Sequence, residues 1–166
     1  MCSFLALASY KMGIEFKYIK EGLENYTGTK RRFEKKGFVN GALVIDDYAH
    51  HPTEICATLN ALSNVKHNSE WLIFQPHTYT RTFSLLKEFS EALSNAENVI
   101  ITDIYAAREK DTGLVHSRDL AERIDGAVYI SSLEEAAEYI KKNAREGDVV
   151  ITMGAGNVCD VAKYLI

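Results

Sequence analysis

The chain has 166 residues, enough for one ordinary domain with a full hydrophobic core. Hydrophobic residues make up 46% and charged residues 25%, proportions typical of a soluble globular protein. The net charge of −4 argues against nucleic acid as the main partner. The three cysteines show no C-x-x-C spacing, which favours reduced thiols in a cytoplasm over a disulfide framework or a zinc ribbon.

The apolar start, from Cys2 to Tyr10, shares only its hydrophobicity with a signal peptide. No basic segment precedes it, and Lys11 stands where a cleavage site would be sought. The run is also too short to span a bilayer. The sequence therefore predicts a cytoplasmic protein with no membrane partner.

Two short helices are predicted first, over residues 3–11 and 15–25, with Gly13 between them. A helix pair that begins at Met1 without a capping residue is typical of the end of a longer unit. Gly28 then breaks the helical pattern. We therefore expect the main domain to begin after this point.

A β-hairpin is predicted next, because apolar runs over 33–39 and 42–45 flank Asn40-Gly41. The basic cluster Lys30-Arg31-Arg32 precedes it. We interpret this cluster as a solvated edge that discourages aggregation, in preference to an anion site, although both interpretations stay open.

Strands and helices alternate after the hairpin. This alternation, with continuous apolar strands, predicts an α/β fold: a three-layer, mostly parallel Rossmann-like sheet with the hairpin as an antiparallel edge. The strands are expected over 71–74, 99–101, 128–130 and 149–152. The helices are expected around Ile55, Leu59, Leu62 and Val65; Phe83, Leu86, Phe89 and Leu93; residues 117–124; Leu133, Ala136, Ala137 and Ile140; and Val158, Val161, Ala162 and Leu165.

The stretch from Val44 to Glu54 is the most informative. An apolar run leads into a polar turn, and Pro52 then suits the first position of a helix. Glu54 in the first turn suits the positive end of the helix dipole. The stretch predicts a strand, a turn and a helix, with the turn at the carboxyl end of the strand, where open α/β sheets bind ligands.

Polar residues follow each of the main strands. Because the carboxyl ends of parallel strands meet at one rim of the sheet, we expect these residues to converge. They are Asp46, Asp47, Tyr48, His50 and His51; Gln75, His77, Tyr79 and Arg81; Asp103, Tyr105, Arg108 and Glu109; and Gly154, Ala155, Gly156 and Asn157.

Two narrower motifs are weak signals when taken alone. His50, His51 and Glu54 invite a zinc interpretation, but Pro52 separates the histidines from the helix, so one histidine is expected to be a helix cap and no metal ligand is predicted. The segment 154–156 suits either an anion cradle or tight packing, and it lacks the third glycine of a dinucleotide fingerprint. No P-loop pattern occurs in the sequence.

The segment 46–54 resembles the signature of the Mur ligase family, in the branch that attaches L-alanine to UDP-N-acetylmuramate for peptidoglycan synthesis. The segment 75–82 looks like the second C-terminal motif of that family, and 30–34 is similar to its entry into the last domain. The segments 106–109 and 153–157 also match in type and order, so the resemblance extends from about Leu5 to the end. Three residues depart from the pattern: Thr78 for a common arginine, Asn157 for an aspartate and Ala106 for a proline.

The resemblance implies a three-domain enzyme of which this chain holds the last part. Residues 1–28 are expected to be terminal helices of the central ATP-binding domain, and 29–166 the C-terminal domain. Partners implied are UDP-N-acetylmuramate, L-alanine, ATP and the enzyme's own preceding domains. Magnesium is implied too, with its main ligands in those domains.

Residue roles follow from the resemblance. The implied catalytic residues stabilise an acyl phosphate or donate to substrate oxygens, other side chains surround the amino acid, and the rest contact the nucleotide. The catalytic group is Arg81, His50 and His77; the substrate-binding group is Tyr48, Tyr79, Arg108 and Glu109; the cofactor-binding group is Asp47, Gly154, Gly156 and Asn157.

Two other functions remain open. A related ligase attaches a recycled tripeptide to the same sugar and would need a wider amino-acid pocket. A non-catalytic nucleotide-binding module would suit the alternating elements equally well. As a fragment of a ligase, the chain by itself is expected to be inactive, because it has no P-loop.

Overall fold

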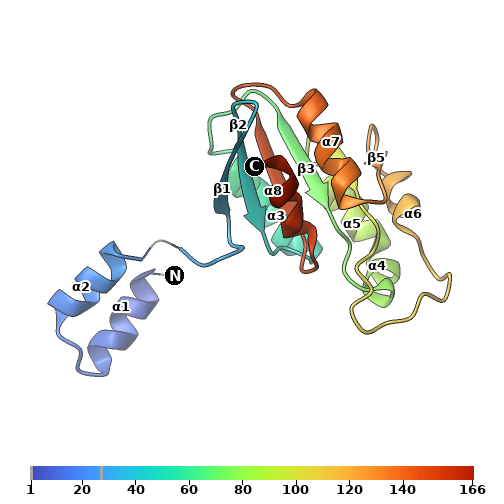
Figure 1. Ribbon diagram of the computed structural model, residues 1–166. Coiled ribbons are helices and arrows are strands. Elements are labelled where there is room, and N and C mark those ends of the chain that lie inside the picture. The colour runs from blue at the N-terminus through green and yellow to red at the C-terminus, as the bar shows by residue number, and fades with distance from the viewer. Residues whose placement is uncertain (1, 27) are drawn as a thin grey trace.

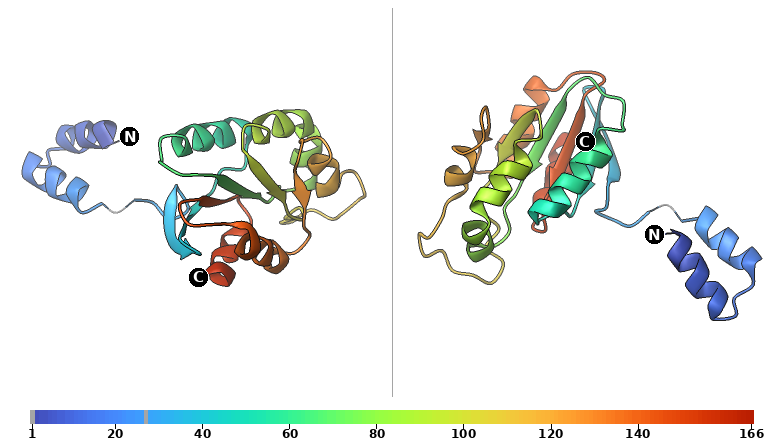
Figure 2. Two further views of the ribbon diagram at one scale, coloured as in Figure 1. Left: turned by 90° about the horizontal axis from the view of Figure 1, so that it is seen from above. Right: turned by 180° about the vertical axis from the view of Figure 1, so that it is seen from behind.

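The computed structural model describes residues 2–26 and 28–166, and only the backbone of residues 2 and 3. The first elements are α1 (Cys2–Lys11) and α2 (Phe16–Glu24), so the predicted helix pair is confirmed. Gly13, with φ of 85°, takes the left-handed conformation that ends a helix. The pair lies apart from the sheet domain in Figures 1 and 2. The expected lack of a cap at Met1 falls outside the described residues.

The predicted hairpin is present as β1 (Glu34–Val39) and β2 (Ala42–Asp47), which pair antiparallel. Asn40 and Gly41 form the turn with φ of 51° and 82°. Positive φ at both central residues is the geometry that matches the twist of the flanking strands. The Asn-Gly pair therefore forms the turn because both residues adopt positive φ, which is also why the pair predicts a hairpin.

Six strands form one sheet in the order β1-β2-β6-β3-β4-β5. The remaining strands are β3 (Glu70–Phe74), β4 (Asn98–Ile101), β5 (Val128–Tyr129) and β6 (Val149–Met153). All neighbours from β2 onward pair parallel, so the mostly parallel sheet with one antiparallel edge is confirmed. The last strand, β6, inserts between β2 and β3, which places the chain's final loop beside the turn after β2.

Helices cover both faces of this sheet (Figure 2). One face packs against α3 (Pro52–Leu62), α5 (Leu86–Leu93) and α6 (Ser117–Ala121), and the other against α7 (Leu133–Asn143) and α8 (Val161–Leu165). Strand residues alternate between the two cores. Ile45 faces the first core and Val44 the second, and both are fully buried.

Two predicted helices differ from the structure. The helix expected to carry Phe83 through Leu93 is two helices, α4 (Tyr79–Ser84) and α5, with a break at Leu85. In α4, Thr82 is buried and Phe83 is 52% exposed, so Phe83 does not belong to the predicted buried stripe. The closing helix begins with a 3-10 turn, η1 (Val158–Asp160), before α8.

Two further observations concern membrane-spanning helices and the cysteine thiols. In the part of the chain that the structure describes, no helix has both the length and the apolar character needed to cross a membrane. Cys56 and Cys159 are free thiols, as predicted, and the side chain of Cys2 lies outside the described atoms.

Candidate functional site

The turn after β2 is organised by Asp47. Its Oδ1 accepts hydrogen bonds from the Ala49 N–H at 2.8 Å and the Thr58 hydroxyl at 3.3 Å. Its Oδ2 accepts from the Phe33 N–H at 2.8 Å. The side chain is 5% exposed, because strand alternation directs it toward α3 and directs Asp46 to the other face. Asp47 is therefore buried within the turn, and its predicted contact with the nucleotide stays a prediction.

The two adjacent histidines have different partners. His51 is the N-cap of α3, and its Nδ1 accepts from the Thr53 N–H at 3.4 Å. Pro52 holds the first helical position, as predicted. The His50 Nδ1 lies 3.0 Å from the carbonyl oxygen of Tyr48, so Nδ1 carries a proton and donates. Within the described ranges, no cluster of three or more His, Cys, Asp or Glu residues is arranged to hold a metal ion.

Glu54 fastens His50 to the start of α3. Its Oε2 accepts from the His50 N–H at 3.0 Å and lies 3.4 Å from the His50 Nδ1. Burial by itself raises the pKa of Glu54, but the hydrogen bond from His50 and nearby positive charge outweigh it, so the net pKa lies below its usual value. The carboxylate stays ionised at neutral pH and fixes the first turn.

His77 lies beside both His50 and Arg81, as predicted from the strand ends. The rings of His50 and His77 have centroids 5.9 Å apart. The Arg81 Nη1 lies 3.4 Å from the His77 Nδ1, and a guanidinium can only donate. Burial, followed by the charges of Arg81 and His50, lowers the pKa of His77, so its ring is neutral at neutral pH with the proton on Nε2.

The ring of Tyr105 packs against the ring of His77. Its N–H donates to the Pro76 carbonyl at 2.9 Å, and its carbonyl accepts from the Thr78 N–H at 2.9 Å. The ring of Tyr105 stacks on His77 with centroids 5.7 Å apart and planes 21° from parallel. Sequence reasoning placed Tyr105 at a strand end but gave it no role, since its backbone pairing with residues 76–78 has no sequence signal.

Glu109 holds the start of α4 in place. Its Oε2 accepts from the Thr80 N–H at 3.0 Å and its Oε1 from the Thr80 hydroxyl at 2.5 Å. These two bonds lower the pKa of Glu109. Both carboxylate oxygens are thus bonded within the chain, on the helix that carries Arg81. The neighbouring Arg108 is exposed and has no hydrogen-bond or ion-pair partner among the described residues.

The two tyrosines predicted to bind substrate lie in different places. Tyr48 stands beside His50, with ring centroids 5.4 Å apart, and the Arg31 guanidinium lies 4.9 Å from the centre of its ring. Tyr79 instead lines a separate cavity of about 260 Å³ with Asp103 and Asp111. Burial and these carboxylates raise the pKa of Tyr79. The structure therefore does not bring Tyr79 beside Tyr48.

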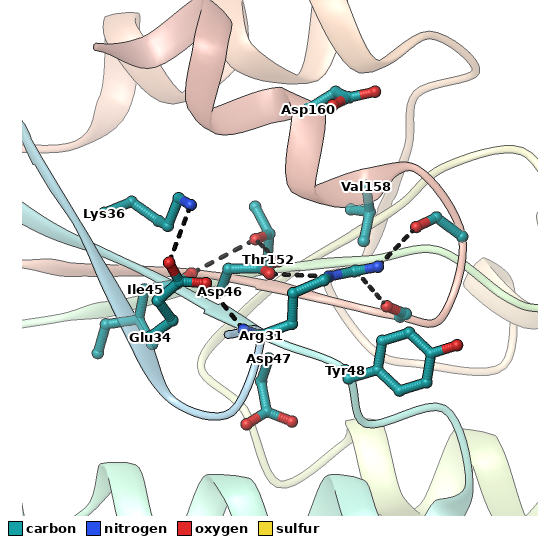
Figure 3. Close-up of polar contacts among 12 residues, drawn as sticks. Arg31, Glu34, Lys36, Ile45, Asp46, Asp47, Tyr48, Thr152, Val158 and Asp160 are labelled. Carbon is teal, nitrogen blue, oxygen red and sulfur yellow. Dashed lines mark hydrogen bonds and ion pairs between the residues drawn. The ribbon is translucent and has the colours of Figure 1, made fainter. Parts of the chain in front are cut away.

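Arg31 fastens the turn after β2 to the loop after β6 (Figure 3). Its Nε donates to the Asp46 Oδ2 at 3.0 Å, its Nη2 to the Gly154 carbonyl at 2.6 Å and its Nη1 to the Gly156 carbonyl at 3.0 Å. Asp46 is fully buried and also accepts from the Thr152 hydroxyl at 2.7 Å. The interpretation of the basic cluster as a solvated edge is thus wrong for Arg31.

The glycines of the 154–157 loop are required by close packing. A Cβ on Gly154 would lie 2.7 Å from the Gln75 carbonyl oxygen, and one on Gly156 would overlap the Gln75 Oε1. The Gln75 side chain also donates to the Asn157 Oδ1 at 2.9 Å and accepts from the Val158 N–H at 3.0 Å. The Gly154 N–H donates to the Asp47 carbonyl, so it is not free for an anion.

Comparison with known proteins shows the family to which the chain belongs. Residues 31–156, most of the chain, match the family described as "Mur ligase, glutamate ligase domain". The chain belongs to the Mur ligase family. This confirms the predicted resemblance, and the matched range of the Mur ligase domain contains every predicted site residue except Asn157.

Individual Mur ligases resemble this chain over nearly its whole length. The UDP-N-acetylmuramate–L-alanine ligase of Acetivibrio thermocellus is 54% identical over 96% of the chain, which spans 35% of that protein. The solved UDP-N-acetylmuramate–alanine ligase of Thermotoga maritima has a TM-score of 0.75 at 26% identity, covering 96% of this chain and 34% of that one. A murein peptide ligase from Psychrobacter arcticus has a TM-score of 0.63 at 28% identity, covering 96% and 34%.

Proposed function

We propose that the chain is the C-terminal part of a ligase that uses ATP to join L-alanine to UDP-N-acetylmuramate in the cytoplasm. Residues 29–166 are the last domain, and residues 1–28 are terminal helices of the central domain. The observation that carries the proposal is the contact of His77 with both His50 and Arg81 at the sheet rim. The identity to L-alanine ligases supports the substrate choice.

The proposed reaction proceeds through an acyl phosphate. ATP phosphorylates the lactyl carboxylate of the sugar nucleotide and leaves as ADP. The amine of L-alanine then attacks the acyl carbon, and phosphate departs from the tetrahedral intermediate. The protein must neutralise the phosphoryl charge and hold the amine near the acyl carbon.

Three side chains act on the reacting groups in this proposal. Arg81 supplies fixed positive charge to the acyl phosphate. His77 donates from Nε2 while neutral, because its Nδ1 accepts from Arg81. The Nε2 of His50 accepts a hydrogen bond while the ring is neutral and donates one when it is protonated, because Nδ1 is bonded to Tyr48.

The amino-acid side of the site is assigned to Tyr48, Tyr79, Arg108 and Glu109. Tyr48 forms a wall of the pocket, and the exposed guanidinium of Arg108 pairs with a substrate carboxylate. Glu109 acts through Thr80 on the helix of Arg81. Tyr79 contacts substrate only at the edge of the proposed site, because its side chain lines a separate cavity.

The nucleotide side is assigned to Asp47, Gly154, Gly156 and Asn157. Asp47 acts indirectly in this proposal, because it is buried and positions the turn through its bonds to Phe33 and Ala49. Among the described residues the acidic side chains do not cluster into a magnesium site. We therefore assign the magnesium ligands to the preceding domains of the full-length protein.

The test uses the full-length protein in an assay coupled to ADP release. L-alanine and the murein tripeptide are compared as amine substrates with UDP-N-acetylmuramate. Turnover with L-alanine supports the proposal. Preference for the tripeptide favours the recycling ligase, and the absence of ADP release with either amine favours a non-catalytic nucleotide-binding module.

The chain alone is expected neither to release ADP nor to bind ATP more tightly than about 1 mM, because one wall of a cleft retains few of the bonds that offset lost ligand freedom. Calorimetric titration with ATP and magnesium measures this. Micromolar binding by the isolated chain contradicts the assignment of the main phosphate contacts to other domains.

A further inference from the structure

Tyr105 follows β4 and contacts the segments that follow two other strands. It forms an isolated parallel bridge with His77, after β3. Its N–H donates to the Pro76 carbonyl and its carbonyl accepts from the Thr78 N–H, both at 2.9 Å. After β6, Gly156 lies so close that a Cβ there would be 2.6 Å from the Tyr105 Cγ. Tyr105 is therefore fixed at the point where three strand ends meet.

The backbone that Tyr105 holds is strained at Thr78. Thr78 has φ of 66° and ψ of 143°, a conformation that β-branched residues rarely adopt. Its carbonyl accepts from the N–H of the buried Thr82 at 3.1 Å and from the Thr82 hydroxyl at 2.7 Å. Strained backbone persists where the surroundings hold it, and it is typical of functional sites. Here it lies between His77 and the helix that carries Arg81.

The ring of Tyr105 restricts the imidazole of His77 in a way that a hydrogen bond does not. The Arg81 Nη1 contacts the His77 Nδ1 at 3.4 Å, and a single bond of this kind leaves the imidazole free to rotate about its direction. The Tyr105 ring lies within 21° of parallel to the imidazole, with centroids 5.7 Å apart, which is an offset-stacked arrangement. The two contacts together define both the direction and the plane of the His77 ring.

We infer that Tyr105 is a positioning residue of the ligase, whose ring fixes the orientation of the His77 imidazole and hence the direction in which its Nε2 donates. Tyr105 acts through His77 and needs no contact with substrate. A small misplacement of a catalytic group costs a large part of the rate, so a residue that holds such a group contributes to kcat. The inference rests on the proposed function, in which His77 donates to the reacting groups.

The kinetic test compares Tyr105→Ala with Tyr105→Phe in the full-length protein. The backbone bonds of Tyr105 remain in both variants, so the comparison tests the ring alone. We expect Tyr105→Ala to lower kcat about 10- to 100-fold and to change the KM for ATP by less than about threefold. Tyr105→Phe keeps the stacked ring and is expected to stay within about twofold of the wild type.

A second measurement follows the ring of His77 by NMR in the chain described here. Burial is the main cause of the lowered pKa of His77, and the Tyr105 ring covers part of the imidazole. We therefore expect the His77 midpoint to rise toward 6.5 in Tyr105→Ala and to stay at the wild-type value in Tyr105→Phe. The matched control is Tyr139→Ala, which removes an aromatic contact with Trp71, near the start of β3 and away from the rim. This variant is expected to change neither the midpoint nor the kinetic constants.

The outcomes separate positioning from general stability. Either a wild-type kcat or an unchanged His77 midpoint in Tyr105→Ala overturns the inference. Equal losses in Tyr105→Phe and Tyr105→Ala overturn it too, because the hydroxyl and not the stacked ring is then responsible. An equal fall of kcat in Tyr139→Ala overturns it as well, since lost stability then explains both variants. If the full-length wild type has no ligase activity, only the proposed function fails, and the His77 midpoint still decides the inference.

Discussion

The guanidinium of Arg81 donates to the Nδ1 of His77, at 3.4 Å from Nη1. This contact joins a fixed cation to a neutral imidazole whose Nε2 carries the proton. Two donors of different charge therefore stand side by side at the rim, next to His50. Such a pair suits a group that gains negative charge during reaction, because the donors are already oriented.

The first prediction is that Arg81→Ala in the full-length protein lowers kcat more than it raises the KM for ATP. A charge that stabilises the acyl phosphate acts mainly on the transition state. The loss is expected to add roughly 2–4 kcal/mol to the barrier. Steady-state kinetics measure both constants, with the exposed Arg123→Ala as a control that is expected to change neither. A tenfold rise in KM with unchanged kcat contradicts the role.

The second prediction concerns the ionisation of His77. Its pKa is lowered from the usual 6.5 by burial and by the charges of Arg81 and His50, against the opposing charge of Glu109. The unfolded chain therefore binds a proton more readily than the folded one. Stability is fully present above the usual pKa and falls as pH drops through 6.5 toward the lowered value.

Two measurements check this. Titration followed by NMR is expected to give a midpoint for the His77 ring below 6.5, and Arg81→Gln is expected to raise it. The loss of stability between about pH 7.5 and pH 5, measured by urea unfolding, is expected to be smaller in His77→Gln than in the wild type. A ring that titrates at or above its usual pKa refutes the neutral-donor role.

Local signals predicted the local structure well. The Asn40-Gly41 pair predicted the hairpin turn, and Pro52 predicted the start of α3. The convergence of parallel strand ends at one rim of the sheet predicted that His50 would lie near His77. Each depends on neighbouring residues or on one general property of parallel sheets. The family signature added the identity of the site without any geometry.

Contacts between distant residues could not be predicted in the same way. Arg31 lies more than a hundred residues from Gly156 in sequence, and their bond depends on the insertion of β6 beside β2. Phe83 is exposed in a short helix that ends at Leu85, where the sequence has no Gly or Pro that would predict a break. The sequence therefore gives no signal for the contacts of the side chains that shape the rim loops.

The third prediction is that Arg31→Met lowers the free energy of unfolding by about 3 kcal/mol, because it leaves the fully buried Asp46 carboxylate without its cation. Adding Asp46→Asn is expected to recover most of this loss, since no buried charge remains. Arg32→Met is expected to change stability by less than about 0.5 kcal/mol. Urea unfolding of the three variants measures the differences. If Arg31→Met alone is as stable as the wild type, then solvent screens the charge of the Asp46 carboxylate.

The last prediction is that Gly156→Ala destabilises the domain by about 1–3 kcal/mol through overpacking. The added Cβ would overlap the Gln75 Oε1 and would lie 2.6 Å from the Tyr105 Cγ. The Gln75 side chain must then lose its hydrogen bond with the Val158 N–H, or the ring of Tyr105 must move away from His77. The substitution therefore disturbs contacts at the sheet rim as well as packing in the core.

The matched control is Gly22→Ala in α2, where a Cβ meets nothing within 4 Å and φ is not in the left-handed region. This change is expected to be neutral or to favour the helix by up to about 1 kcal/mol. Urea unfolding compares the two alanine variants, and the ring signals of His77 show whether Tyr105 has moved. If Gly156→Ala unfolds at the wild-type midpoint with unchanged His77 signals, then close packing does not explain the glycine.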